Sequence, residues 1–183
     1  MRVFTDKHDH DIVRLLSGGG VGILRTDTLY GIVARANDER AVEQVYHLKD
    51  RDSTKSPIVL ISSLEQLFDQ PDEATAKLID DVWPGKVSII IPSSHAPSWI
   101  TRGNGSVAYR LPADDSLRQL LAQTGPLIAP SANPEGEAPA MTVDAAITYF
   151  GDDIDFYVDE GEVVDAAPSQ LLRLIDGTLE RLR

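Results

Sequence analysis

The sequence predicts an α/β domain in which a central sheet is covered by helices on both faces. Three short runs, 58–61, 87–91 and 127–129, carry apolar residues on both faces, as strands do when both sides of a sheet are buried. Between them lie segments whose apolar residues recur at helical spacing. Alternating strands and helices favour a layered α/β architecture. The loops at the strand ends are then expected to hold a ligand cavity.

The elements follow in order along the chain. A helix is expected over 9–16, where apolar residues form a stripe, and glycines 18–20 then turn the chain into a strand that starts at Val21. The next helix is expected over 37–49, with Asn37 as its N-cap. Further helices are expected at about 74–82, 116–123 and 143–150, further strands over 107–111, 154–158 and 170–174, and loops over 92–105 and 131–142.

The strand that starts at Val21 leads into a cluster of hydroxyl groups. If the chain stays extended as far as Gly31, the side chains of Thr26, Thr28 and Tyr30 lie on one face. These three hydroxyls are candidates to line a ligand pocket. The alternative is a strand end whose hydroxyls only satisfy the local backbone.

Length and composition limit the class of protein. A chain of 183 residues, 42% of them hydrophobic, is expected to form one globular domain, 1–183. The absence of cysteine excludes disulfides, thiolate metal sites and cysteine nucleophiles. Because no apolar run approaches the roughly 20 residues of a membrane span and no signal peptide is evident, we expect a cytoplasmic protein. A net charge of −12 argues against general nucleic-acid binding.

Two cations lie at the C-terminal end of the second predicted helix. Lys49 and Arg51 are two residues apart, with Lys55 close behind. One interpretation is a solvated charge run, since lysine is favourable at a helix C-terminus. The other is an anion clamp, in which lysine supplies a point charge and arginine a planar fork.

A third cation lies inside a predicted strand. Arg110 follows Val107, Ala108 and Tyr109 in a segment that is otherwise apolar. A strand covered on both faces does not normally contain an unpaired charge. Arg110 therefore pairs either with an internal carboxylate or with the carboxylate or phosphate of a ligand.

Neutral polar groups are found beside two other strands. Ser131 and Asn133 follow the strand at 127–129 and face the same way if the chain is extended, although Asn133 before Pro134 is also a common turn opener. Ser169 precedes the strand at 170–174 in the same manner. Anion binders and neutral hydrogen-bonding groups gathered at strand ends indicate a pocket for an anionic small molecule.

Six motifs in order extend over nearly the whole chain. They are T-D-T-L-Y-G at 26–31, K-x-R at 49–51, W-P-G at 83–85, V-A-x-R-x-P at 107–112, P-S-A-N at 130–133 and P-S at 168–169. With these motifs the chain resembles the YrdC-domain family, the threonylcarbamoyl-AMP synthases, in their short single-domain form. The resemblance implies a twisted mixed sheet with a positively charged cavity.

The resemblance also implies an activity and a set of site residues. The expected reaction forms L-threonylcarbamoyladenylate from L-threonine, bicarbonate and ATP, with release of pyrophosphate, and its product serves tRNA modification by downstream proteins. Mg²⁺ is expected to arrive with the phosphates of ATP, without a dedicated metal site. By resemblance, Thr26, Arg110 and Ser169 hold threonine, and Lys49, Arg51, Ser131 and Asn133 contact ATP.

Two residues depart from the pattern that the resemblance implies. The family usually has proline at the positions of Arg25 and Asp52, both beside the expected pocket. Asp52 is a candidate partner for Arg51 or Lys55, and Arg25 either adds a positive charge to the pocket or points away. These departures leave a second hypothesis, a non-synthetic relative that binds nucleotide or RNA, with ribosome maturation as its process. The charge of −12 disfavours bare RNA binding.

Overall fold

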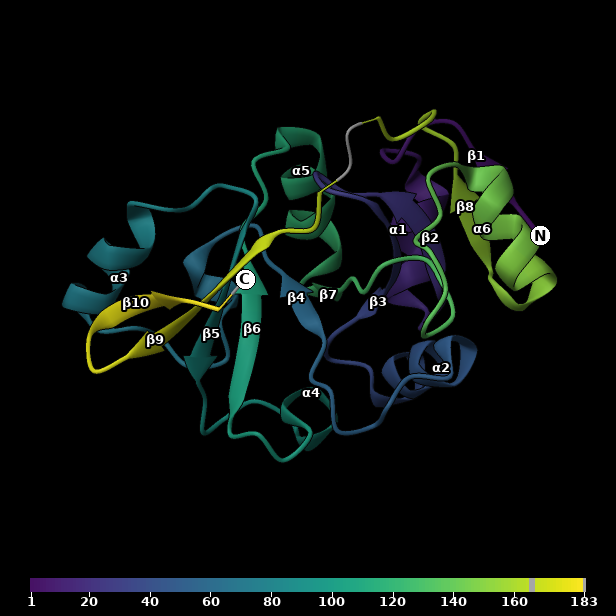
Figure 1. Cartoon of the computed structure of the whole chain (residues 1–183). Coiled ribbons are helices and arrows are strands. Elements are labelled where there is room, and N and C mark those ends of the chain that lie inside the picture. Colours follow the sequence, from purple (N-terminus) through teal and green to yellow (C-terminus); the bar gives the residue numbers. More distant parts are fainter. Residues whose placement is uncertain (165–166, 183) are drawn as a thin grey trace.

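The computed structural model describes residues 1–164 and 167–182, so residues 165, 166 and 183 of the expected domain 1–183 lie outside it. Its strands are β1 (Val3–Phe4), β2 (Gly22–Arg25), β3 (Tyr30–Arg35), β4 (Ile58–Leu60), β5 (Val87–Pro92), β6 (Ser106–Arg110), β7 (Leu127–Ile128), β8 (Phe156–Val158), β9 (Gln170–Ile175) and β10 (Thr178–Arg181). Within the described residues they form one twisted mixed sheet (Figure 1), in the order β1-β8-β2-β3-β7-β4-β6-β5-β9-β10. The predicted α/β class is confirmed.

Five of the six described helices occupy the segments in which the sequence places them. They are α1 (His10–Ser17), α2 (Glu39–Lys49), α3 (Glu73–Asp80), α4 (Ser98–Thr101), α5 (Asp115–Thr124) and α6 (Val143–Phe150), with single 3-10 turns η1 (Leu64–Gln66) and η2 (Gly151–Asp153). The bounds of the five predicted helices agree with the structure within two residues, and α4 was not predicted. Among the described helices, none is long and apolar enough to cross a membrane.

Buried side chains lie on both faces of the sheet. On one face, α1 and α5 pack through Ile12, Leu16 and Leu121 against Leu24 and Leu60 of the strands. On the other face, helices α2 and α6 pack in a larger cluster that also holds Ile23, Ile32 and Val59. The sheet is therefore covered on both sides, as its apolar strands predict.

The chain does not stay extended from Val21 to Gly31, which was the condition for placing the three hydroxyls on one face of a strand. β2 ends at Arg25, and β3 begins at Tyr30 and runs antiparallel to it. Residues 26–29 form the tight turn between them, closed by a hydrogen bond of 2.9 Å from the Thr26 amide to the Leu29 carbonyl. The turn was not foreseen because this segment lacks the glycine and proline that usually signal one.

Three further features differ from the sequence prediction. The N-cap of α2 is Asp38 rather than Asn37, because the Asp38 side chain accepts a hydrogen bond of 3.1 Å from the Ala41 amide. The loop predicted over 92–105 contains the one-turn helix α4. The edge strands β1 and β10 were not predicted, since each is too short or too polar to give a clear strand pattern.

Candidate functional site

Two adjoining cavities lie against the sheet. The smaller cavity, of about 300 Å³, is lined from the β2–β3 turn, β6, the segment after β7 and the segment before β9. Seven of the nine predicted site residues line it: Thr26, Thr28, Tyr30, Arg51, Arg110, Ser131 and Ser169. The other two, Lys49 and Asn133, are buried and line neither cavity. The fold therefore gathers residues from distant motifs into one place.

The β2–β3 turn forms one wall of the smaller cavity. The Thr26 hydroxyl donates to the Leu29 carbonyl at 2.7 Å and lies 3.1 Å from the Thr28 hydroxyl. It also accepts from the amides of Thr28 and Leu29, each at 3.2 Å. Thr26 thus satisfies the local backbone, as one sequence interpretation holds, and still lines the cavity. The turn is fixed before any ligand arrives.

Tyr30 contributes its ring to the cavity while its hydroxyl is engaged elsewhere. That hydroxyl donates to the Gly161 carbonyl at 2.7 Å and accepts from the Glu160 amide at 3.2 Å. Burial raises the pKa of the Tyr30 hydroxyl above its usual value, and the Glu160 amide partly offsets that rise. Tyr30 therefore positions the 160–161 segment against β3.

The P-S-A-N segment is held against β3 at a glycine. Gly31 and Ser131 form an antiparallel bridge, and the Ala132 amide donates to the Tyr30 carbonyl at 2.8 Å. A Cβ at Gly31 would lie 3.3 Å from both the Pro130 carbonyl and the Thr26 methyl. Glycine permits this close approach, which places Ser131 beside the β2–β3 turn.

Arg110 forms a buried ion pair with Asp27. Its Nη2 lies 3.0 Å from a carboxylate oxygen of Asp27, and the two side chains are 4% and 3% exposed. Burial lowers the pKa of Arg110, and the charge of Asp27 opposes that change. The internal carboxylate that the sequence left open is therefore Asp27. Arg110 nevertheless lines the smaller cavity, and its buried Nε has no hydrogen-bond partner among the described residues.

Lys49 fixes a loop beside the smaller cavity without lining the cavity itself. As the last residue of α2 it is 2% exposed, and its Nζ donates to the backbone carbonyls of Ser131 and Asn133. Burial lowers the pKa of Lys49 to about 8, and the nearby charge of Arg51 adds to the effect. The Asn133 amide nitrogen donates at 2.8 Å to the carbonyls of Pro134 and Glu137. Both residues thus fix the loop that presents Ser131.

Arg51 lies at the boundary of the two cavities and lines both. Its Nη2 donates to the Ser56 carbonyl at 3.3 Å, and the guanidinium lies 5.6 Å from the centre of the Tyr46 ring. The buried Nε has no hydrogen-bond partner in the part of the chain that the structure describes. Arg51 is therefore oriented by its neighbours and retains capacity for an anion.

The two residues that depart from the family pattern lie outside both cavity linings. Arg25 donates to the Glu160 carbonyl at 3.2 Å. Asp52 accepts from the amide and hydroxyl of Thr54, at 2.9 and 2.7 Å. Lys55 pairs instead with Glu135, so Asp52 forms an ion pair with neither Lys55 nor Arg51 among the described residues. Neither departure places a charge in the candidate site.

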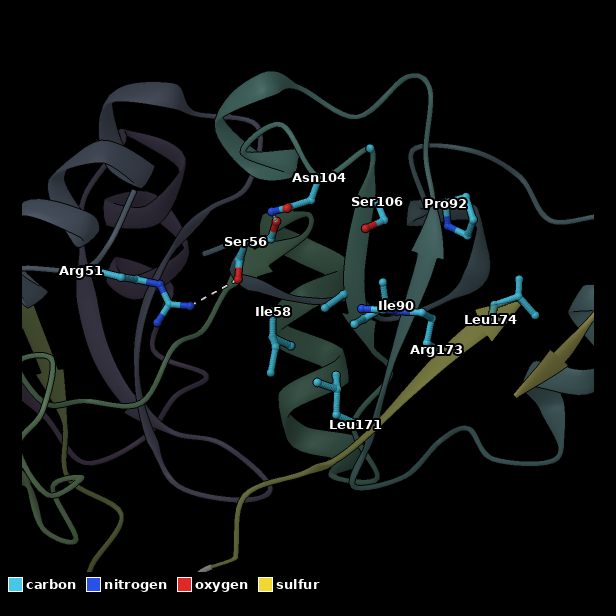
Figure 2. A pocket seen from close by; sticks show the side chains of 12 residues that line it. Arg51, Ser56, Ile58, Ile90, Pro92, Asn104, Ser106, Leu171, Arg173 and Leu174 are labelled. Carbon is cyan, nitrogen blue, oxygen red and sulfur yellow. Dashed lines mark hydrogen bonds between the residues drawn. The ribbon is translucent and has the colours of Figure 1, made fainter. Parts of the chain in front are cut away.

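The larger cavity, of about 670 Å³, adjoins the smaller one, and Figure 2 shows the residues that line it. Arg51 and Ile58 line both cavities. Its polar lining includes Ser56, Asn104 and Ser106, with Asn104 donating to the Ser56 hydroxyl at 3.0 Å. Sequence reasoning missed these three residues and Arg173, because they belong to no local motif and meet only in the folded chain.

Comparison with known proteins is consistent with this geometry. The family model for Sua5, YciO and YrdC proteins, described as "Telomere recombination", matches residues 14–183. A threonylcarbamoyl-AMP synthase of Coxiella burnetii is 34% identical over 180 residues, which are 94% of this chain and 96% of that protein. One from Marinobacter nauticus is 31% identical over 165 residues, with 87% of each chain covered.

Solved structures share the fold. Sua5 of P. abyssi in complex with L-threonine is 28% identical, with a TM-score of 0.86. The comparison covers 100% of this chain but 56% of that one, so this chain spans little more than half the length of Sua5. E. coli YciO, at 18% identity and a TM-score of 0.83 over 100% of this chain and 93% of its own, supports the fold alone. By its sequence match and its architecture, the chain belongs to the Sua5/YciO/YrdC family.

Proposed function

We propose that this protein synthesises L-threonylcarbamoyladenylate from L-threonine, bicarbonate and ATP, with release of pyrophosphate, for threonylcarbamoyladenosine modification of tRNA in the cytoplasm. The observation that carries the proposal is the pair of adjoining cavities that share Arg51. One cavity has the size and polarity for an amino acid and the other for a nucleotide. The names of the synthase relatives and the threonine bound to Sua5 support the same assignment.

Threonine is assigned to the smaller cavity. Arg110 would receive its carboxylate, since a planar guanidinium binds a carboxylate through two parallel hydrogen bonds. Thr26 and Ser169 would face the threonine amine and hydroxyl. The Ser169 hydroxyl lies 2.9 Å from that of Ser88, so a buried neighbour orients it.

ATP is assigned to the larger cavity, with its α-phosphate at the boundary beside Arg51. Ser131, on the neighbouring wall of the smaller cavity, would donate its hydroxyl to a phosphate oxygen. Lys49 and Asn133 would act on ATP through the loop that they fix, because neither lines a cavity. No acidic side chain is among the described lining residues, so Mg²⁺ would be held by the phosphates.

The reaction then depends on positioning and electrostatics. The threonine amine attacks the carbon of bicarbonate, water leaves, and a carbamate forms. A carbamate oxygen attacks the α-phosphorus of ATP, and pyrophosphate departs as the phosphoanhydride bond breaks. Holding the reactants side by side removes much of the entropic barrier. Arg51 would stabilise the negative charge that develops on the transferred phosphorus.

Pyrophosphate release by the purified protein tests this function. Release is expected to require both threonine and bicarbonate, and mass spectrometry should detect the mixed anhydride. A folded protein that binds ATP and threonine but releases no pyrophosphate would contradict the synthase assignment. That outcome would favour the second hypothesis, a relative that binds nucleotide or RNA without the reaction.

A further inference from the structure

We infer that Arg173 is a nucleotide-binding residue, whose guanidinium stacks on the base of the nucleotide in the larger cavity. The inference rests on the proposed function, because it takes the ligand of that cavity to be ATP. It adds a residue that lies outside every motif of the sequence. Figure 2 shows Arg173 extending from β9 past Ile90 into the cavity.

Strand pairing places Arg173 in a continuous row of side chains that continues to Glu180 of β10, a residue that lines neither cavity. Ile58 of β4 pairs with Ala108 of β6, Ala108 pairs with Ile90 of β5, and Ile90 pairs with Arg173 of β9. All four residues line the larger cavity. Paired residues on neighbouring strands project to the same face of a sheet. The part of the row that lines the cavity therefore forms an apolar floor that ends in a guanidinium.

The Arg173 guanidinium is available for a ligand. It is exposed, and it makes no ion pair or hydrogen bond within the part of the chain that the structure describes. Apart from Arg51, no other charged side chain is among the described residues that line the larger cavity. A ligand in this cavity thus meets one arginine at the boundary with the smaller cavity and another at the far end of the floor.

The strand that carries Arg173 also serves the threonine site. Ser169, Leu171 and Arg173 alternate along β9 and its approach, so their side chains share one face. Ser169 lines the smaller cavity, whereas Leu171 and Arg173 line the larger one. A nucleotide whose α-phosphate lies beside threonine therefore directs its other end along this strand toward Arg173.

The chemistry of the floor identifies that other end as the base. Ile58, Ala108 and Ile90 offer apolar surface, which suits an aromatic ring and not a chain of phosphates. Arginine stacks on aromatic faces through its planar guanidinium, whereas lysine does not provide this surface. Asn104 and Ser106 on the polar side of the cavity suit the ribose hydroxyls. Arg173 would thus fix the orientation of the nucleotide.

Binding measurements on three variants test the inference. Arg173→Leu keeps much of the side-chain stem, Arg173→Lys keeps the charge, and Arg181→Leu removes an exposed arginine of β10 that lines neither cavity. Calorimetry would measure the dissociation constants of ATP, AMP, pyrophosphate and threonine for each. Arg173→Leu is expected to weaken ATP and AMP by the same factor, roughly tenfold, and to leave pyrophosphate and threonine unchanged. Arg173→Lys should recover little of that loss, and Arg181→Leu should match the wild type.

Three results would overturn the inference. Unchanged affinity of Arg173→Leu for ATP and AMP would remove Arg173 from the site. A loss confined to ATP and pyrophosphate would assign it to the terminal phosphates. Full recovery in Arg173→Lys would show that charge and not stacking matters. A protein that binds ATP normally but lacks threonine-dependent pyrophosphate release would refute the proposed function while the binding data still decide the role of Arg173.

Discussion

Arg110 and Asp27 are joined by an ion pair of 3.0 Å in which both side chains are almost fully buried. The pair connects the middle of the sheet to the β2–β3 turn that carries Thr26 and Thr28. Neither carboxylate oxygen of Asp27 has a hydrogen-bond partner in the described part of the chain. Asp27 therefore depends on Arg110 for its compensation and holds the guanidinium at the cavity wall.

Arg110→Ala is expected to abolish threonine-dependent pyrophosphate release. It should also lower the free energy of unfolding by about 3 kcal/mol, because it leaves the Asp27 carboxylate buried and unpaired. The double variant with Asp27→Asn removes that charge and should recover much of the stability without recovering turnover. Urea unfolding and the pyrophosphate assay measure the two effects separately. A double variant that regains activity would exclude Arg110 as the carboxylate site.

Arg51→Ala is expected to weaken ATP binding by at least tenfold and threonine binding much less. The reason is that charge-assisted hydrogen bonds to phosphate are worth about 1.5–3 kcal/mol each. Asp52→Ala is the matched control, since Asp52 is the next residue and lines neither cavity. Calorimetry with ATP compares them, and equal affinities in both variants would exclude Arg51 as a phosphate ligand.

Lys49 predicts a dependence of stability on pH. Its pKa is lowered from 10.5 to about 8, so the folded state loses a proton that the unfolded state keeps between these values. The penalty is fully present below pH 8 and is relieved as the pH rises toward 10.5. The wild type should therefore gain about 3 kcal/mol of stability relative to Lys49→Met across this range. Urea unfolding at several pH values measures the difference, and parallel pH profiles would contradict the prediction.

Substitutions of Tyr30 and Thr28 distinguish a hydroxyl that stabilises the fold from one that faces the ligand. Tyr30→Phe should lower the free energy of unfolding by about 1–2 kcal/mol, because the Gly161 carbonyl and Glu160 amide lose their partner. Threonine affinity should change little, since that hydroxyl is already engaged. Thr28→Val should instead weaken threonine binding more than it affects stability. If Tyr30→Phe weakened threonine binding more than Thr28→Val does, the Tyr30 hydroxyl, and not the β2–β3 turn, would face the ligand.

Sequence reasoning predicted most of the elements and seven of the fourteen described residues that line the smaller cavity. Arg110 is the clearest case, because a charge within an apolar strand requires a partner wherever the strand lies. The identity of that partner was not predictable, since Asp27 is brought to it by the unforeseen β2–β3 turn. The role of Lys49 in fixing the loop that presents Ser131 was not predictable either. Its hydrogen-bond acceptors lie more than 80 residues away in the chain.

The larger cavity could not be predicted from the single sequence. Its floor depends on the parallel pairing of Ile90 with Arg173, between strands separated by most of the C-terminal half of the chain. In the sequence, Arg173 is only one charged residue in a strand of intermediate exposure. No spacing rule distinguishes it from Arg181, which faces neither cavity.

The smaller cavity links ligand binding to cooperative unfolding, because residues from distant parts of the sheet line it. β8 pairs with β2 near one edge of the sheet, and β9, which Ser169 precedes, pairs near the other edge. The smaller cavity is lined by the β2–β3 turn from one part of the sheet and by Ser169 from the other, so a threonine bound there would contact both. At a hundredfold excess over Kd, bound threonine would stabilise the folded state by about 2.7 kcal/mol, which opposes separation of the two parts. The amide protons of β2 and β9 should then exchange more slowly together, as in a molecule that opens as one unit.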